Sequence, residues 1–107
     1  MNIFYGGIFV RKETLKEAGI KHPIKLEYYK MINEDKFVNE NNSKYGIKVV
    51  KTEYLDNDII TENKEIKNLS DSEQRTNEIL ETLKRNDVTP IGVQDIMQDF
   101  FEKKKYL

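Results

Sequence analysis

The residues best suited to chemistry in this chain are acidic side chains at helical spacing. Asp95 and Asp99 stand four residues apart in the passage VQDIMQDFF, and on a helix this spacing places both carboxylates on one face. The pair could bind a metal ion, but no His and no third carboxylate has the spacing to complete a ligand set. We interpret the two aspartates as part of a solvent-facing surface, and we predict no metal site and no cofactor.

A second acidic cluster occupies the middle of the chain. Residues 56–58 (Asp-Asn-Asp) and Glu62 resemble the start of a calcium-binding loop, but Ile60 and Thr61 stand where such a loop needs a ligand and a glycine. His22 is the only histidine and there is no cysteine, so a Cys–His nucleophile pair is excluded. There is also no nucleophile elbow and no phosphate-cradling glycine loop. The sequence therefore favours a non-enzymatic protein.

The passage KRNDVTPIGVQDIMQDFF raises the question of a helix-turn-helix that reads DNA. The outer face of its second helix would carry Gln94, Asp95, Gln98, Asp99 and Glu102. The glutamines could read adenine edges, but the carboxylates would repel phosphate. Basic residues follow only at Lys103, Lys104 and Lys105. A structural helical hairpin is favoured, and nucleic-acid binding through the two glutamines and the three lysines is the alternative. If the outer acidic face has a role, recognition of a basic partner fits it better than DNA.

Tyrosine is frequent, with six residues in a chain of 107. We expect Tyr29, Met31 and Tyr54 on the outward side of strands, where Tyr and Met are typical of protein interfaces. Stacking of single-stranded nucleic acid is the competing interpretation. The expected partner is another protein or a second copy of the chain, bound through the Tyr29/Met31 face or a strand edge. Nucleic acid is not favoured, and no membrane partner is expected.

Strands must position these side chains in the first part of the chain. In IKLEYYKMIN, Ile24, Leu26, Tyr28 and Ile32 alternate on one face, which predicts a strand. Residues 45–55 predict a second strand, a turn follows at 56–58, and residues 59–61 predict a short third strand. Residues 3–10, with two central glycines, suit a bulged strand or a tight hairpin. Residues 11–19 predict a short helix, and residues 34–44 have the composition of a loop.

Two helices are predicted after residue 69. Ser70 and Glu73 have the spacing of a capping box for the first, and Asn86 is its expected end. Thr89 as N-cap and Pro90 at the first helical position begin the second. Val88 and Val93 are spaced as a hydrophobic staple. The apolar residues then recur at helical spacing: Val93, Ile96, Met97, Phe100 and Phe101.

The sequence thus predicts an α+β fold, a small antiparallel sheet of three to four strands packed on one face by two C-terminal helices. Residues 1–107 form a single domain, with 1–20 as a peripheral N-terminal hairpin or strand, 21–69 β-rich and 70–107 a helical hairpin. The charges nearly cancel, 18 basic against 19 acidic, so no basic field attracts nucleic acid. No signal-like or membrane-length apolar segment is present, and a cytoplasmic location is expected. The predicted core consists of Ile24, Leu26, Tyr28, Ile32, Ile47, Val49, Ile79, Leu80, Leu83, Val93, Ile96, Met97, Phe100 and Phe101.

Three passages, EYYKMINE, KYGIKVVK and LKRNDVTPIGVQDIMQDFF, resemble a small family of uncharacterised proteins of low-GC Gram-positive anaerobes. The resemblance covers residues 27–101 and leaves residues 1–20 outside. It implies no activity, because that family has none assigned. The residues that carry it are Tyr28, Tyr29, Tyr45, Gly46, Ile47, Val88, Thr89, Pro90, Asp95, Asp99 and Phe100.

Overall fold

The computed structural model describes residues 1–10, 22–33 and 44–105 of the chain. Its elements, in chain order, are β1 (Asn2–Val10), β2 (Ile24–Ile32), β3 (Tyr45–Tyr54), β4 (Ile59–Ser70), α2 (Glu73–Arg85), η1 (Pro90–Gly92) and α3 (Val93–Lys105). The short helix predicted over 11–19 and nearly all of the loop predicted over 34–44 lie outside the described residues.

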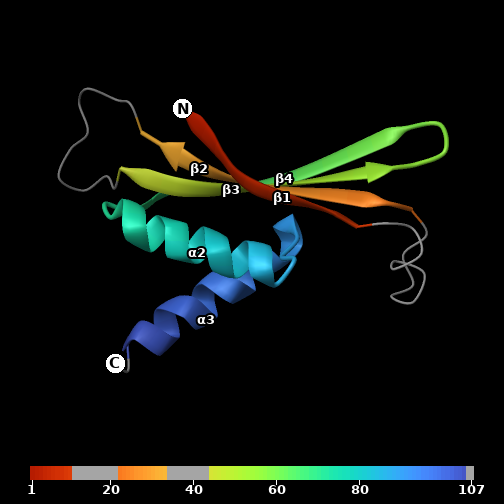
Figure 1. The fold of residues 1–107 in the computed structure, drawn as a ribbon. Helices are drawn as coiled ribbons and strands as arrows, with labels where there is room; N and C mark the ends of the chain where they lie inside the picture. Colours follow the sequence, from red (N-terminus) through yellow and green to blue (C-terminus); the bar gives the residue numbers. More distant parts are fainter. Residues whose placement is uncertain (11–21, 34–43, 106–107) are drawn as a thin grey trace.

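The four strands form one antiparallel sheet in the order β1-β2-β3-β4, so each strand pairs with the next one along the chain. The helices α2 and α3 and the short η1 segment lie on one face of this sheet (Figure 1). The predicted α+β class is confirmed, with four strands in the sheet.

Alternation along the strands places the core between the sheet and the helices α2 and α3. Every second residue of β2, from Ile24 to Lys30, is buried, and the residues between them are partly exposed. Tyr28 is 0% exposed, and its hydroxyl donates a hydrogen bond to the Val88 carbonyl oxygen at 2.9 Å. The buried apolar residues of the core are Ile24, Leu26, Tyr28, Ile47, Val49, Ile79, Leu80, Leu83, Val88, Val93 and Met97.

Two residues of the predicted core, Ile32 and Ile96, are not fully buried, and Val88 is a buried core residue that the sequence did not predict. Ile32 is the last residue of its strand and Ile96 lies at the margin of the core. The side chains of Phe100 and Phe101 lie outside the described residues.

β4 is the largest departure from the prediction, because it extends from Ile59 to Ser70 and not over three residues. Its charged and polar residues hide the alternation that a half-buried strand usually shows. Near its end, the register shifts between the Tyr45–Ser70 and Ile47–Ile66 partners, and Asn68 takes a left-handed conformation with φ 55°. Gly46 faces this bulge, where a Cβ atom would collide with the Ile66 carbonyl oxygen.

The helix α2 begins two residues later than the capping box predicted. Ser70 ends β4, so Ser72 is the N-cap and accepts a hydrogen bond from the Arg75 N–H at 3.1 Å. The Glu73 carboxylate does not reach back to a cap; it lies 2.6 Å from the Lys30 ammonium. Ser72 directly precedes the helix and, unlike Ser70, lies outside the sheet, so it takes the capping role.

The link from α2 to α3 is a Schellman turn. The N–H of Val88 donates to the Leu83 carbonyl and that of Asp87 to the Lys84 carbonyl, after the predicted C-cap at Asn86. Asp87 adopts the left-handed conformation that such a turn requires, with φ 51°. Thr89 and Pro90 then begin a 3₁₀ turn, not the α-helix itself, and the Thr89 side chain makes no capping hydrogen bond.

Candidate interaction face

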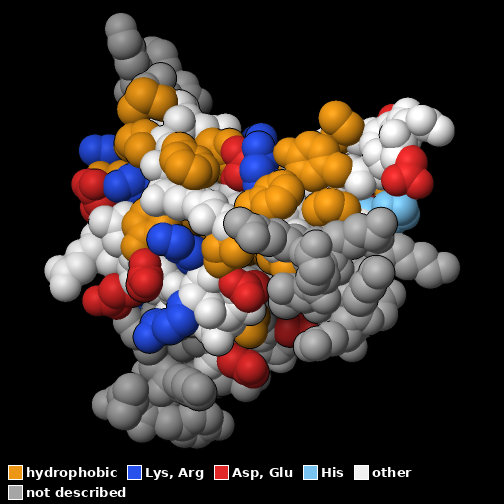
Figure 2. Space-filling view, turned by 45° about the vertical axis from the view of Figure 1, so that its right-hand side comes forward, with side chains coloured by type: hydrophobic (Ala, Val, Ile, Leu, Met, Phe, Trp, Pro, Cys, Tyr) orange, Lys and Arg blue, Asp and Glu red, His pale blue; other side chains and the backbone are white. Residues whose placement is uncertain are grey.

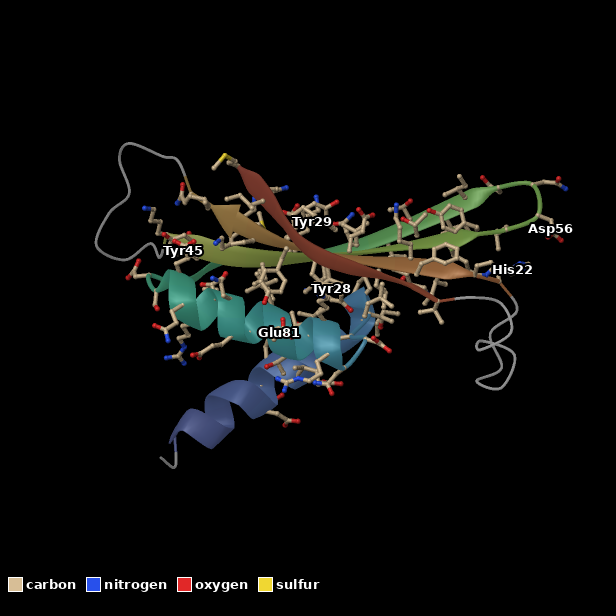
Figure 3. The ribbon with its side chains drawn as sticks, viewed as in Figure 1. His22, Tyr28, Tyr29, Tyr45, Asp56 and Glu81 are labelled. Atoms are coloured by element: carbon tan, nitrogen blue, oxygen red, sulfur yellow. The ribbon has the colours of Figure 1, made fainter. Side chains whose placement is uncertain are left out.

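The sheet face opposite the helices is not covered by any described element (Figure 1). We call it the open face. Consecutive strand residues point to opposite faces of the sheet, so Tyr28 lies on the helix side and Tyr29 on the open side (Figure 3). Hydrophobic side chains gather along the sheet at the top of Figure 2, with Lys and Glu between them. From the strand register, the large apolar and aromatic residues of the open face are Phe4, Phe9, Tyr29, Met31, Tyr54 and Ile59.

The first aromatic contact of the open face joins β1 and β2. Phe4 lies opposite Tyr29 in the register, with ring centroids 5.5 Å apart and planes at 64°, an edge-to-face geometry. The Tyr29 hydroxyl donates to a Glu27 carboxylate oxygen at 2.8 Å. This hydrogen bond, with partial burial and the Glu27 charge, raises the pKa of Tyr29. Phe4 nevertheless remains 57% exposed, so the pair presents a ring to solvent.

The second aromatic contact lies at the other end of the open face. Phe9 and Tyr54 have ring centroids 6.1 Å apart, and Tyr54 lies opposite Ile59 across the β3–β4 hairpin. Phe9 is 58% and Ile59 60% exposed. Tyr29 pairs with Lys48, six residues before Tyr54 on β3, so about 20 Å of strand separates the two aromatic pairs. They form two apolar ends of one face, not one continuous patch.

The charges between these ends are paired within the face itself. Lys25 lies 3.6 Å from Glu27, and Lys48 lies 3.2 Å from Glu65 on the neighbouring strand. Because each of these ammonium groups already has a carboxylate partner, the face carries little uncompensated charge. A partner with a strong net charge would therefore gain little electrostatic attraction from this face.

The predicted interaction residues fall on two separate surfaces. Tyr29, Met31 and Tyr54 share the open face. Gln94, Asp95, Gln98 and Asp99 are all exposed on α3, which lies on the helix side. The side chains of Lys103, Lys104 and Lys105 lie outside the described residues.

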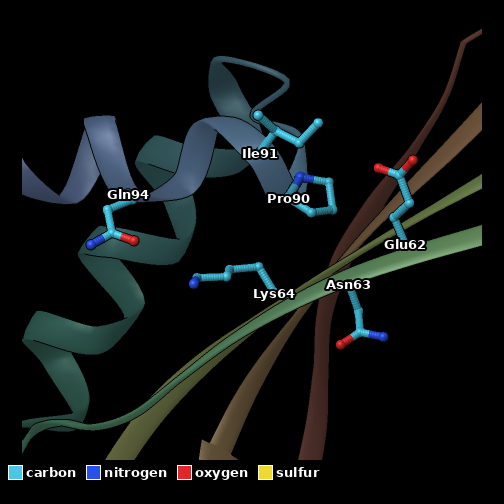
Figure 4. A pocket seen from close by; sticks show the side chains of 6 residues that line it. All are labelled: Glu62, Asn63, Lys64, Pro90, Ile91 and Gln94. Carbon is cyan, nitrogen blue, oxygen red and sulfur yellow. The ribbon is translucent and has the colours of Figure 1, made fainter.

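The two glutamines of α3 border hollows beside β4. Gln94 lines a hollow of ≈ 260 Å³ together with Glu62, Lys64 and Ile91 (Figure 4). A neighbouring hollow is lined by Lys64, Met97 and Gln98, among others. Asp95 and Asp99 line neither hollow. The two glutamines therefore lie on the side of α3 near β4, and the two aspartates lie on its solvent-facing side.

In residues 1–10, 22–33 and 44–105, no three His, Cys, Asp or Glu side chains come together in a group that could hold a metal ion. Over the same residues, no helix has both the length and the apolar character needed to cross a membrane. His22 lies partly exposed just before β2.

Comparison with known protein families identifies a family for this chain. A family model covers residues 8–103. The chain belongs to the family of unknown function DUF6514. Neither the curated proteins nor the solved structures contain a match. The DUF6514 match extends further toward the N-terminus than the sequence motifs did, since it begins inside β1.

Sequence reasoning missed three of the six open-face residues. Phe9 and Ile59 lie within the DUF6514 match, and Phe4 lies just before it. The available signal for Phe4 was the Gly6-Gly7 pair, because the bulge between Phe4 and Gly6 reverses the alternation of β1. Ile59 lay in the strand that was predicted too short. These three omissions thus follow from errors in strand extent or phase, not in residue type.

Proposed function

We propose that this DUF6514 protein is a non-enzymatic interaction module that binds another protein through its open sheet face. The observation that carries the proposal is the set of exposed rings, Phe4 at 57% and Phe9 at 58%, each held by a tyrosine on an uncovered sheet. Ordered aromatic side chains lose little entropy when a partner covers them, which favours them as anchors.

The chemistry of the face favours a partner surface that is flat, apolar and nearly neutral. The Lys25–Glu27 and Lys48–Glu65 pairs satisfy the charges of the face without a partner. The four strands have 9, 9, 10 and 12 residues, so the open face is about 30 Å or more long.

The paired lysines also argue for protein over nucleic acid. Binding to a phosphate backbone draws its affinity from free cations that release counterions, and on this face the nearest cations already contact carboxylates. The proposal includes a bacterial, cytoplasmic setting, which rests on the sequence motifs.

Site-specific photo-crosslinking in the cells that make the protein tests this proposal. A benzophenone amino acid is placed at Tyr29 or Tyr54, and the matched control places it at Gln74, an exposed residue of α2 on the helix side. We expect a protein adduct at the first two positions and not at the third. The adduct protein, once purified, should bind the wild type and lose at least tenfold in affinity for Phe4→Ser and Phe9→Ser.

Two results would contradict the proposal. Adducts at Gln74 that match those at Tyr29 and Tyr54 would remove the link to the open face. A gel shift with single-stranded nucleic acid that disappears in Phe4→Ser would assign the rings to base stacking instead.

A further inference from the structure

The outer edge of β4 is a second surface available for binding. β4 is the last strand of the sheet, so along its outer side the sheet has no further strand among the described residues. Its partners run without a shift over residues 59–66, whereas the other edge strand, β1, is interrupted by a bulge after Phe4. A regular edge strand presents unpaired N–H and C=O groups that can pair with another strand.

The helix-facing side chains of this edge follow a symmetric order. They are Ile60, Glu62, Lys64 and Ile66, with Asn63 at the centre of the segment on the opposite face. Glu62 and Lys64 form no ion pair with any residue of the described ranges. An apolar residue thus stands at each end, with one acidic and one basic residue between them.

We propose that the chain pairs with a second copy of itself through β4, antiparallel, about a two-fold axis at Asn63. In this register, Glu62 of each copy lies opposite Lys64 of the other, which gives two complementary charge pairs. Ile60 of each copy lies opposite Ile66 of the other. The two sheets then join into one eight-stranded sheet with all helices on the same side, and both open faces remain uncovered.

The charge order selects this register over its neighbours. An axis at Glu62 would place the Glu62 carboxylates of the two copies opposite each other. An axis at Lys64 would place the two Lys64 ammonium groups opposite each other. Like charges directly opposite each other on neighbouring strands are destabilising. Centring on Asn63 is therefore the arrangement, among these three, in which the charges of the edge attract.

The η1 turn supports the same pairing. Ile91 is 82% exposed, the highest value among the exposed large hydrophobic residues. It lines the hollow beside Glu62, Asn63 and Lys64, next to the proposed axis (Figure 4). A second β4 strand docked at this edge would cover part of the hollow. Ile91, which now contacts solvent, would then lie closer to apolar atoms of the second copy.

Sedimentation equilibrium with charge-exchange variants tests the proposal. The wild type should show a monomer–dimer equilibrium. Glu62→Lys alone places two ammonium pairs across the axis, and Lys64→Glu alone places two carboxylate pairs there. Each single variant should weaken self-association about tenfold to a hundredfold. The variant with both substitutions should recover it, and so should an equimolar mixture of the two single variants, because that heterodimer contains only opposite-charge pairs.

A matched control and two outcomes decide the result. Asp99→Lys makes the same charge change as Glu62→Lys, but on the exposed side of α3, and should leave the equilibrium unchanged. Circular dichroism should show every variant folded. A wild type that stays monomeric at all concentrations overturns the proposal. Single variants that weaken association while neither the double variant nor the mixture restores it overturn the register. Phe4→Ser and Phe9→Ser should not change the dimer, so the open-face and edge proposals fail separately.

Discussion

Replacing Tyr28 by phenylalanine removes one buried hydroxyl and keeps the ring. Tyr28 is 0% and Val88 7% exposed, and the hydroxyl of the first donates to the carbonyl of the second at 2.9 Å. The variant leaves that carbonyl oxygen without its donor inside the core. We expect Tyr28→Phe to lower the free energy of unfolding by about 1–2 kcal/mol near neutral pH.

Titration of the Tyr28 hydroxyl makes the stability difference between the wild type and Tyr28→Phe depend on pH. Burial, with a smaller contribution from the Asp87 charge, raises the pKa of Tyr28 above the value of about 10 in an unfolded chain. Below pH 10 both states keep the proton and the stability is fully present. As pH rises further, only the unfolded chain loses the proton, so the wild type loses about 1.4 kcal/mol of stability per pH unit. The variant lacks this loss, so the two proteins should become equally stable near pH 11.

Urea unfolding followed by far-ultraviolet circular dichroism at pH 7, 10 and 11 measures both effects. Tyr5 and Tyr29, whose pKa values are also raised, are present in both proteins and cancel in the difference. Tyr54→Phe is the matched control, because the Tyr54 hydroxyl has no hydrogen bond to the described residues; it should change stability by less than about 0.5 kcal/mol. If the wild-type and Tyr28→Phe profiles stay parallel between pH 10 and 11, the reasoning about burial is wrong.

Three further predictions concern the bulge, the turn after α2 and the Lys30–Glu73 contact. Gly46→Ala should cost about 1–3 kcal/mol, because the added methyl group meets the Ile66 carbonyl oxygen; Gly92→Ala, where the nearest side-chain atom is 3.6 Å away, is the control in thermal unfolding. Asp87→Gly should stabilise the protein by about 0.5–1 kcal/mol, since glycine takes a positive φ without steric cost, and an unchanged melting temperature would contradict it. A hydrogen bond from Lys30 lowers the pKa of Glu73, so the stability it contributes is present above about pH 4.5 and is lost as pH falls through the folded pKa. Glu73→Gln should therefore flatten the acid limb of the stability profile, as measured by urea unfolding between pH 6 and 3, and an unaltered limb would exclude this role.

The local sequence pattern predicted an element correctly where its hydrophobic periodicity was strong. The alternation from Ile24 to Tyr28 predicted both the strand and its buried face, and the spacing of Val93 and Met97 predicted the inner side of α3. The extent of β4 was underestimated because its burial is limited to partial burial of Lys64, Ile66, Leu69 and Ser70. Its pairing with β3, and not its own hydrophobicity, defines the strand. A pattern read within one strand does not show the partner strand that stabilises it.

The candidate site was predictable only in part, for the same reason. Tyr29, Met31 and Tyr54 were placed on the outward side of strands by parity alone. Their aromatic neighbours Phe4 and Phe9 come from β1, whose phase depends on a bulge that residue types do not reveal. The capping error at Ser70 likewise reflects the sheet, because a strand that continues to that residue prevents it from capping a helix.

The contacts that tie the sheet to α2 and to the turn after it span long stretches of sequence. Tyr5 bonds to Glu81, Tyr28 to Val88 and Lys30 to Glu73, at separations of 76, 60 and 43 residues. A ribosome produces the strands first, and each hairpin can form as soon as its second strand emerges. The nascent sheet must then wait, with Leu26, Ile47 and Val49 uncovered, until α2 has been synthesised. During that interval both faces of the sheet are bare, so the order of synthesis makes the unfinished chain more prone to aggregation than the finished protein.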